Sequence, residues 1–200
     1  MLQTRHAPVP DALRLAPEVA LPRARAHEAA GPARAVFALL AAARTTGPVL
    51  WLRPAWSAER LAGDGLRGFL DPGRLIFGGA RSATDILWAA EQALLSGQVP
   101  LVVAELPEPP ELTPVRRLHL AAETGAAFGP APLALLLTPG DGGAPGVETR
   151  WHLAPAPGWA EDGAPRWRLT RARARMAPPA SWEMRLERGE LRLEAAATGR

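Results

Sequence analysis

The sequence predicts an α/β fold in which a mostly parallel sheet has helices on both faces and is extended by antiparallel C-terminal strands. Short apolar segments alternate with amphipathic helical segments between residues 24 and 138, an order typical of β-α-β units. The segment VPLVVAEL at 99–106 is almost entirely apolar, as expected of a strand that helices cover on both faces. After residue 139 apolar and polar residues alternate, which indicates antiparallel strands.

The expected strands of the α/β part follow an N-terminal leader. Four prolines interrupt residues 1–22, so we expect this Pro-rich leader to be irregular. Residues 24–29 are a candidate first strand. The other strands of this part are short apolar runs: PVLWL at 48–52, RLIFG at 74–78, VPLVVAEL at 99–106 and PLALLLT at 132–138.

The helices between these strands are predicted from their ends and their apolar stripes. The clearest one follows Ser82, an N-cap residue, has Asp85 in its first turn and is closed by Gly97. Its stripe places Leu94 against the sheet, where we also expect Val102 of the next strand to be buried. Three other helices are expected at 32–44, 57–63 and 113–125.

The C-terminal part is expected to extend the same sheet. Four segments alternate like strands: TRWHLA at 149–154, RWRLTRAR at 166–173, SWEMRLE at 181–187 and ELRLE at 190–194. The last two flank Arg188-Gly189 and predict a hairpin. The chain is therefore expected to comprise the leader at 1–22, an α/β core at 23–139 and a strand extension at 140–200.

Composition excludes several kinds of chemistry. The 200 residues include no cysteine, and all 23 basic residues are arginine, so thiolate metal sites and mechanisms that need a lysine are excluded. The four histidines show no ligand spacing, so no metal site is expected. Neither a signal peptide nor a membrane-spanning segment is visible, so we expect a cytoplasmic location and no membrane contact.

The order of elements at 46–106 resembles the core of the RecA family: a strand, a turn, a short helix, a second strand preceded by Asp, a long helix that ends in Ser-Gly, and an apolar strand. The continuation LTPVRRLHLAAETG at 112–125 and the segments at 149–157 and 165–175 resemble ImuA, a RecA-like accessory protein family of bacterial damage-induced mutagenesis. The resemblance covers 24–187. It implies an ImuB-like pseudo-polymerase as partner, with RecA and an error-prone DNA polymerase as further partners.

The chain departs from an active RecA-like ATPase at three places. The turn equivalent to the phosphate loop, residues 31–36, lacks the lysine that reaches the phosphates. Pro54 and Ala55 stand where the family has its water-activating glutamate. Ala104 stands at the magnesium-linked aspartate, and Glu105, one place later, is better explained as an ordinary strand-end carboxylate. We therefore expect no catalytic residue, no cofactor and no ATPase activity.

Two groups of residues are candidates for contact with a partner or DNA. The first is the segment RWRLTRARAR, which carries five arginines and no acid: Arg166, Arg168, Arg171, Arg173 and Arg175. Arg171, Arg173 and Arg175 would form a row on one face. Trp167 and Leu169 have the same parity as this row, so either a bulge near Thr170 changes the register or the strand leaves the core there. Such a strip binds an acidic partner or phosphates, or is a solvated edge strand protected by its charge.

The second group comprises Trp88, which lies off the apolar stripe of its helix, and Trp56, which follows a proline turn. Each is an interface residue or packs on a neighbouring element. The net charge of only +3 provides little attraction for nucleic acid, so DNA binding is expected to be weak or indirect.

These observations predict a non-catalytic RecA-like adaptor in SOS-induced, error-prone translesion DNA synthesis. The alternative is a cell-division inhibitor similar to SulA, which also has a RecA-like core without a phosphate loop and acts on the division GTPase FtsZ. An enzyme with a repurposed pocket is a third class, and no residue constellation supports it.

Overall fold

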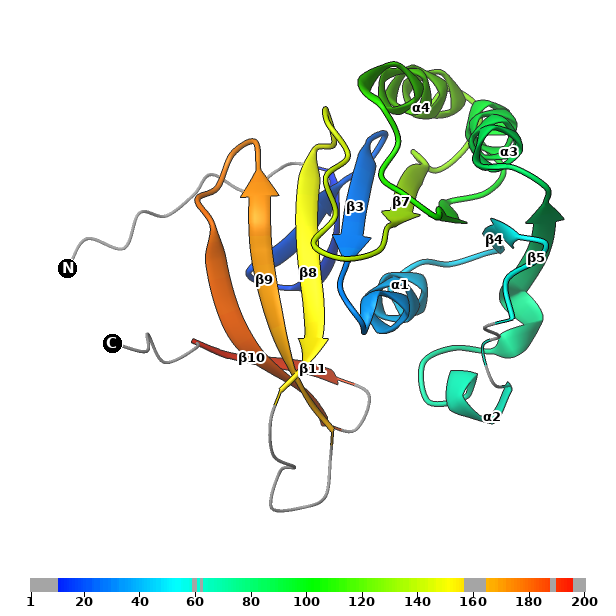
Figure 1. The fold of residues 1–200 in the computed structure, drawn as a ribbon. Coiled ribbons are helices and arrows are strands. Elements are labelled where there is room, and N and C mark those ends of the chain that lie inside the picture. Colours follow the sequence, from blue (N-terminus) through cyan, green and yellow to red (C-terminus); the bar gives the residue numbers. More distant parts are fainter. Residues whose placement is uncertain (1–10, 59–60, 62, 157–164, 188–189, 196–200) are drawn as a thin grey trace.

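A computed structural model describes residues 11–58, 61, 63–156, 165–187 and 190–195. Its parallel strands are β3 (Ala26–Ala30), β4 (Val49–Pro54), β5 (Leu75–Ala80), β6 (Leu101–Glu105), β7 (Leu133–Leu137) and β8 (Thr149–Pro155). Three antiparallel strands follow: β9 (Arg166–Ala174), β10 (Ala180–Glu187) and β11 (Glu190–Ala195). All nine form one sheet in the order β11-β10-β9-β8-β3-β7-β6-β4-β5 (Figure 1). The predicted fold class is confirmed. Strand β8 joins the parallel and antiparallel parts of the sheet, because it is parallel to β3 and antiparallel to β9.

Helices cover opposite faces of the parallel strands. Helix α1 (Arg34–Ala43) packs on one face, and α3 (Ala83–Ser96) and α4 (Leu112–Gly125) lie side by side on the other (Figure 1). Leu94 and Val102 are both fully buried between α3 and the sheet, as predicted. In the described residues, no helix has the length and apolar character needed to cross a membrane.

The ends of α3 match the predicted signals. The amide of Asp85 donates to the Ser82 hydroxyl (3.1 Å), and Gly97 ends the helix with φ of 66°. A Cβ on Gly97 would lie only 2.3 Å from the carbonyl oxygen of Gly125, the last residue of α4. The backbones of the two helices therefore touch at their C-terminal ends, which only glycine permits.

The expected irregular leader is wrong for residues 11–22. These residues form an antiparallel hairpin of β1 (Ala12–Ala16) and β2 (Val19–Pro22), whereas residues 1–10 lie outside the described part of the chain. Its inward-facing side chains are buried on the α1 face of the sheet: Leu13, Leu15, Val19 and Leu21. The prolines do not prevent this pairing, because Pro17 lies in the turn and Pro22 is the last residue of its strand.

The expected helix at 57–63 is also misplaced. Ser57 lies in a loop, and the short helix α2 (Gly63–Leu66) begins where the predicted one ends; a 3-10 turn (Pro72–Arg74) precedes β5. Residues 59, 60 and 62 are outside the described residues. The predicted C-terminal hairpin is confirmed by the pairing of Glu187 with Glu190, although its turn at 188–189 is not described.

Candidate functional site

The turn between β3 and α1 is the segment that the sequence resemblance compares with a phosphate loop. The amide of Gly31 donates to the Gly140 carbonyl (2.9 Å), and the amide of Ala33 donates to the Leu153 carbonyl (3.0 Å). Gly31 has φ of +89°, and a Cβ there would lie 2.5 Å from the Leu153 oxygen and 2.8 Å from His152 Nε2. Strand β8 therefore lies directly against the turn, and two amides of the kind that cradle a phosphate are already bonded within the chain.

The two strand ends that carry acids in a RecA-like ATPase have other roles here. Pro54 ends β4 and is buried, and Ala104 near the end of β6 is buried as well. Glu105 accepts a hydrogen bond from the indole Nε1 of the fully buried Trp51 (2.5 Å), which gives this carboxylate a structural role. Among the residues that the structure describes, no group of three histidine or acidic side chains is placed to hold a metal ion.

Glu28 is a fully buried carboxylate in the middle of β3. The Thr138 hydroxyl donates to its Oε1 (2.7 Å), and so do the amides of Gly143 (2.9 Å) and Ala144 (3.1 Å). Arg150 on the adjacent β8 forms an ion pair with its Oε2. Burial of a charge is tolerated when it is paired and fully hydrogen-bonded, and this carboxylate meets both conditions.

This carboxylate holds the connection from β7 to β8. Both strands are parallel neighbours of β3, and residues 138–148 cross over β3 without a helix. The Arg150 guanidinium also donates to the Ala144 carbonyl (2.8 Å), which fixes the same loop from its other side. Glu28 therefore stabilises a crossover that a helix covers in an ordinary β-α-β unit.

Arg171, Arg173 and Arg175 do not form the predicted row. Trp151 of β8 pairs with Arg171, whereas the preceding Arg150 pairs with Arg173, so Ala172 is an extra residue in β9. The bulge lies two residues after Thr170. Because paired residues share a face of the sheet, Arg171 lies on the Trp151 face and Arg173 lies on the opposite one.

By the same pairing, Arg166, Arg168 and Arg173 lie on the face of the sheet opposite Trp151. Arg168 and Arg173 are exposed, and Arg166 is half-buried beside Arg185 of β10, with which it pairs. Arg175 follows the end of β9 and is exposed. Only Arg171 and Arg175 line the groove described next.

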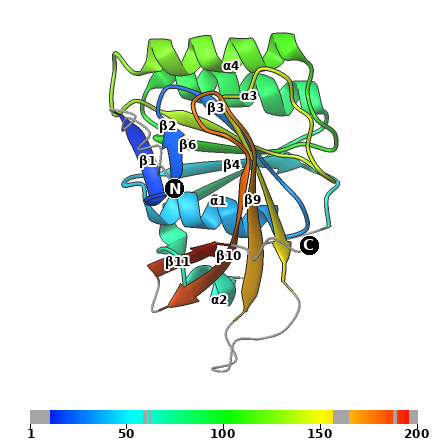
Figure 2. The same cartoon turned by 90° about the vertical axis from the view of Figure 1, so that its left-hand side faces the viewer.

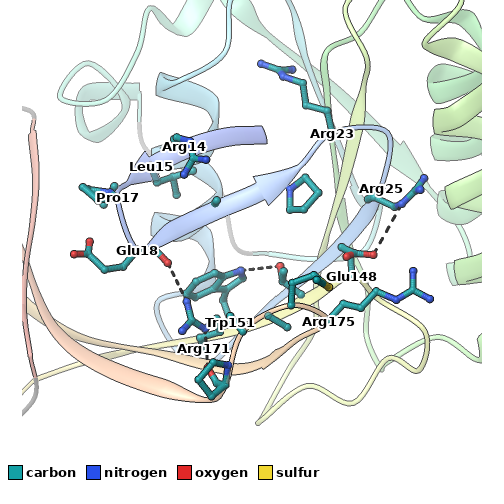
Figure 3. A pocket seen from close by; sticks show the side chains of 18 of the residues that line it. Arg14, Leu15, Pro17, Glu18, Arg23, Arg25, Glu148, Trp151, Arg171 and Arg175 are labelled. Atoms are coloured by element: carbon teal, nitrogen blue, oxygen red, sulfur yellow. Dashed lines mark hydrogen bonds and ion pairs between the residues drawn. The ribbon is translucent and has the colours of Figure 1, made fainter. Parts of the chain in front are cut away.

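A groove of about 1350 Å³ lies between the β1–β2 hairpin and the strands β8 to β10. Figure 2 views the molecule from this side, with the hairpin on one side of β3 and β9 on the other. The groove contains five arginines from segments far apart in sequence: Arg14, Arg23, Arg25, Arg171 and Arg175 (Figure 3). Trp151 and Trp182 provide an aromatic floor. This cleft, which combines aromatic and basic side chains, is the candidate functional site.

Arg171 joins the two walls of this groove. Its Nη1 donates to the Glu18 carbonyl in the hairpin turn (3.1 Å), and its Nε donates to the Pro178 carbonyl after β9 (3.0 Å; Figure 3). The guanidinium carbon lies 5.1 Å from the ring centroid of Trp182 and 5.8 Å from that of Trp151, within the range of cation–π contacts. Burial lowers the pKa of Arg171. Its contacts to Glu18 and Pro178 connect the hairpin to the segment after β9 and so fix the shape of the groove.

The groove floor is connected to the hairpin by buried hydrogen bonds. Trp151 Nε1 donates to the Thr149 hydroxyl (2.8 Å), which lies 2.8 Å from His27 Nδ1. His27 Nε2 lies 2.8 Å from the Pro22 carbonyl, which can only accept, so Nε2 carries the proton and Nδ1 accepts from Thr149. Burial lowers the pKa of His27 to about 4, so the imidazole is neutral near pH 7.

Comparison with known proteins gives matches to one kind of protein. No protein-family model matches the chain. Two curated proteins named Protein ImuA, from two strains of Caulobacter vibrioides, are 38% identical to it over 154 residues, which is 70% of this chain and 60% of each relative. The predicted resemblance to the ImuA family is confirmed. The chain spans about 60% of the length of these ImuA proteins.

The two tryptophans singled out as contacts lie outside the groove that the ImuA-like fold forms. Trp88 on α3 is 60% exposed, and Trp56 after β4 is 69% exposed. By contrast, the strand tryptophans Trp51, Trp151 and Trp167 are buried, whereas Trp182, also expected in the core, is half-buried. The rings of Trp88 and Trp56 are thus not covered by a neighbouring element, and both residues stay candidates for contact with a partner.

The ImuA resemblance and the arginine strip did not point to the groove itself. Seven of its twenty lining residues come from the hairpin, which the sequence interpretation treated as irregular. Two signals were present: the alternation of Leu13 with Leu15, and that of Val19 with Leu21, on either side of a short turn. The pairing of Glu28 with Arg150 had no local signal, because the two residues are far apart in sequence and meet only through the pairing of β3 with β8.

Proposed function

We propose that this protein is a non-catalytic accessory protein of SOS-induced, error-prone translesion DNA synthesis and acts as an adaptor for an ImuB-like pseudo-polymerase in the cytoplasm. The similarity to ImuA carries this proposal and favours it over the SulA-like alternative. RecA and an error-prone DNA polymerase are proposed as further partners. DNA binding is proposed to be weak or indirect, because the net charge is only +3.

The turn between β3 and α1 supports the non-catalytic part of the proposal. To bind a nucleotide, a phosphate loop needs free backbone amides, a cation that reaches the terminal phosphates and a ligand for magnesium. Here the amides of Gly31 and Ala33 bond to other segments of the chain, and Arg34 uses its guanidinium to bond the Gly31 carbonyl (3.3 Å). The turn is therefore occupied by the protein's own groups.

We expect no measurable binding of ATP in the low-micromolar range and no ATP hydrolysis above background. Calorimetric titration with ATP and magnesium, together with a phosphate-release assay, measures both, and an active RecA protein serves as the positive control. Low-micromolar affinity for ATP would show that the turn opens to accept phosphate and would contradict the proposal.

Exposed aromatic residues are candidate contacts for the pseudo-polymerase. Tryptophan is enriched among residues that dominate binding energy at protein interfaces, and large exposed apolar side chains often mark such surfaces. Trp88 and Trp56 meet this description. Together with Arg171 and Arg175, which line the groove, they form the proposed contact residues.

Binding of the ImuB-like protein of the same genome to the wild-type chain tests the proposed function directly. We expect Trp88→Ala to weaken this binding by about 2 kcal/mol, roughly 30-fold, if Trp88 anchors the interface. Gln92→Ala, an exposed position on the same helix, serves as the matched control and should bind like wild type. Wild-type affinity of Trp88→Ala would remove Trp88 from the interface, whereas absence of binding by the wild-type chain would overturn the adaptor role.

A further inference from the structure

The groove between the hairpin and β8 to β10 combines an apolar floor with a basic rim. The floor includes Trp151 and Trp182, whose ring centroids are 6.4 Å apart. Met176 on the rim is 72% exposed, an unusual exposure for a large apolar side chain. Trp151 is only 1% exposed and the Arg171 guanidinium lies over both rings, so the apolar surface open to a ligand is at the rim, at Met176.

The charges around this groove favour an acidic occupant. Five arginines line it, against three carboxylates, those of Asp11, Glu18 and Glu148. Two of these carboxylates already face arginines of the groove: Asp11 lies 3.5 Å from Arg23, and Glu148 lies 3.9 Å from Arg25. The arginines of the groove therefore outnumber its carboxylates, and the net charge of its lining is positive.

Arg175 is the groove arginine best placed to bind an anionic group of a partner. Its side chain is exposed on the rim, and within the described residues no hydrogen bond or ion pair of its guanidinium is found. Arg171 differs, because two carbonyls and two indole rings hold its guanidinium in place. Arg171 therefore shapes the groove, and Arg175 can meet an incoming carboxylate.

We propose that this groove binds an extended, acidic segment of a protein partner, with a large apolar side chain of that segment against Met176 on the rim. The inference rests on the proposed adaptor function and assigns the chemistry of the partner. A protein segment fits better than a nucleic acid strand, because the three carboxylates in the groove would repel a continuous phosphate backbone. A peptide can instead place its carboxylates beside the arginines alone.

The test compares two charge reversals on neighbouring arginines. Arg175→Glu changes the groove, and Arg173→Glu makes the same chemical change on the opposite face of the sheet, beyond the bulge. Both side chains are exposed, so both variants should fold. The probes are the full-length ImuB-like protein of the same genome, overlapping peptides that span it, and single-stranded oligothymidylate.

We expect Arg175→Glu to lower the affinity for the full-length protein by roughly tenfold or more, with a weaker salt dependence, and Arg173→Glu to change it less than about twofold. The peptides that bind wild type should be acidic and contain a large apolar residue. Wild-type affinity of Arg175→Glu for the partner would overturn the groove assignment and leave the adaptor function standing. Loss of oligothymidylate binding alone would identify a nucleic-acid site and overturn it as well. Absence of any binding by the wild-type chain would instead remove the adaptor function on which the inference rests.

Discussion

Replacing Glu28 with alanine is expected to lower the free energy of unfolding by about 3–5 kcal/mol. The substitution leaves Arg150 partly buried without its carboxylate, and it removes the acceptor for the Thr138 hydroxyl and for the amides of Gly143 and Ala144. Breaking a buried ion pair from one side costs more than the pair itself contributes, because the remaining charge is not solvated. Chemical denaturation followed by circular dichroism measures the change.

Glu123→Ala provides the control for this experiment. Glu123 pairs with Arg25 at the surface, and its side chain is 46% exposed, so its loss should cost less than about 1 kcal/mol. Equal effects of the two substitutions would show that Glu28 does not hold the crossover between β7 and β8.

Acidification is expected to destabilise the fold by about 3 kcal/mol through His27 alone. The unfolded chain binds a proton on His27 near pH 6.5, whereas burial lowers the pKa in the folded chain to about 4. Between these two pH values the unfolded state binds more protons than the folded state. The contribution of neutral His27 to stability is therefore fully present above about pH 6.5 and is lost as the pH falls to about 4. Burial also lowers the pKa of His119, which adds to the loss in the same direction.

Unfolding free energies measured at several pH values between 7 and 4 test this expectation. His27→Gln retains a donor for the Pro22 carbonyl and an acceptor for Thr149 but does not titrate, so its stability should depend less steeply on pH than that of the wild type. Identical pH dependence of the two proteins would rule out His27 as the source.

The elements that the sequence predicted well are those whose signals are local. Helix α3 has its cap at Ser82 and its stop at Gly97 within the segment itself, and the apolar strand at β6 needs no partner to be recognised. The hairpin at 12–22 was missed because its prolines were interpreted as breakers, although neither proline removes a bond from the interior of the pair.

The candidate site was only partly predictable because it depends on tertiary pairing. The arginine segment was identified from composition, but alternation along one strand cannot show that an extra residue, Ala172, separates Arg171 from Arg173. The groove brings Arg14 of the hairpin together with Arg175 near the end of the chain, and only the pairing of β8 with β3 and β9 makes this possible.

The close approach of β8 to Gly31 has a consequence for any attempt to restore a phosphate loop. A lysine introduced at position 34 would not restore a phosphate loop, because the Leu153 carbonyl and the His152 ring lie where the loop would have to open. Moving β8 away would detach β9, β10 and β11 from the rest of the sheet. Opening this turn for a phosphate therefore requires a rearrangement of the whole C-terminal part of the sheet, which a single substitution at position 34 does not provide.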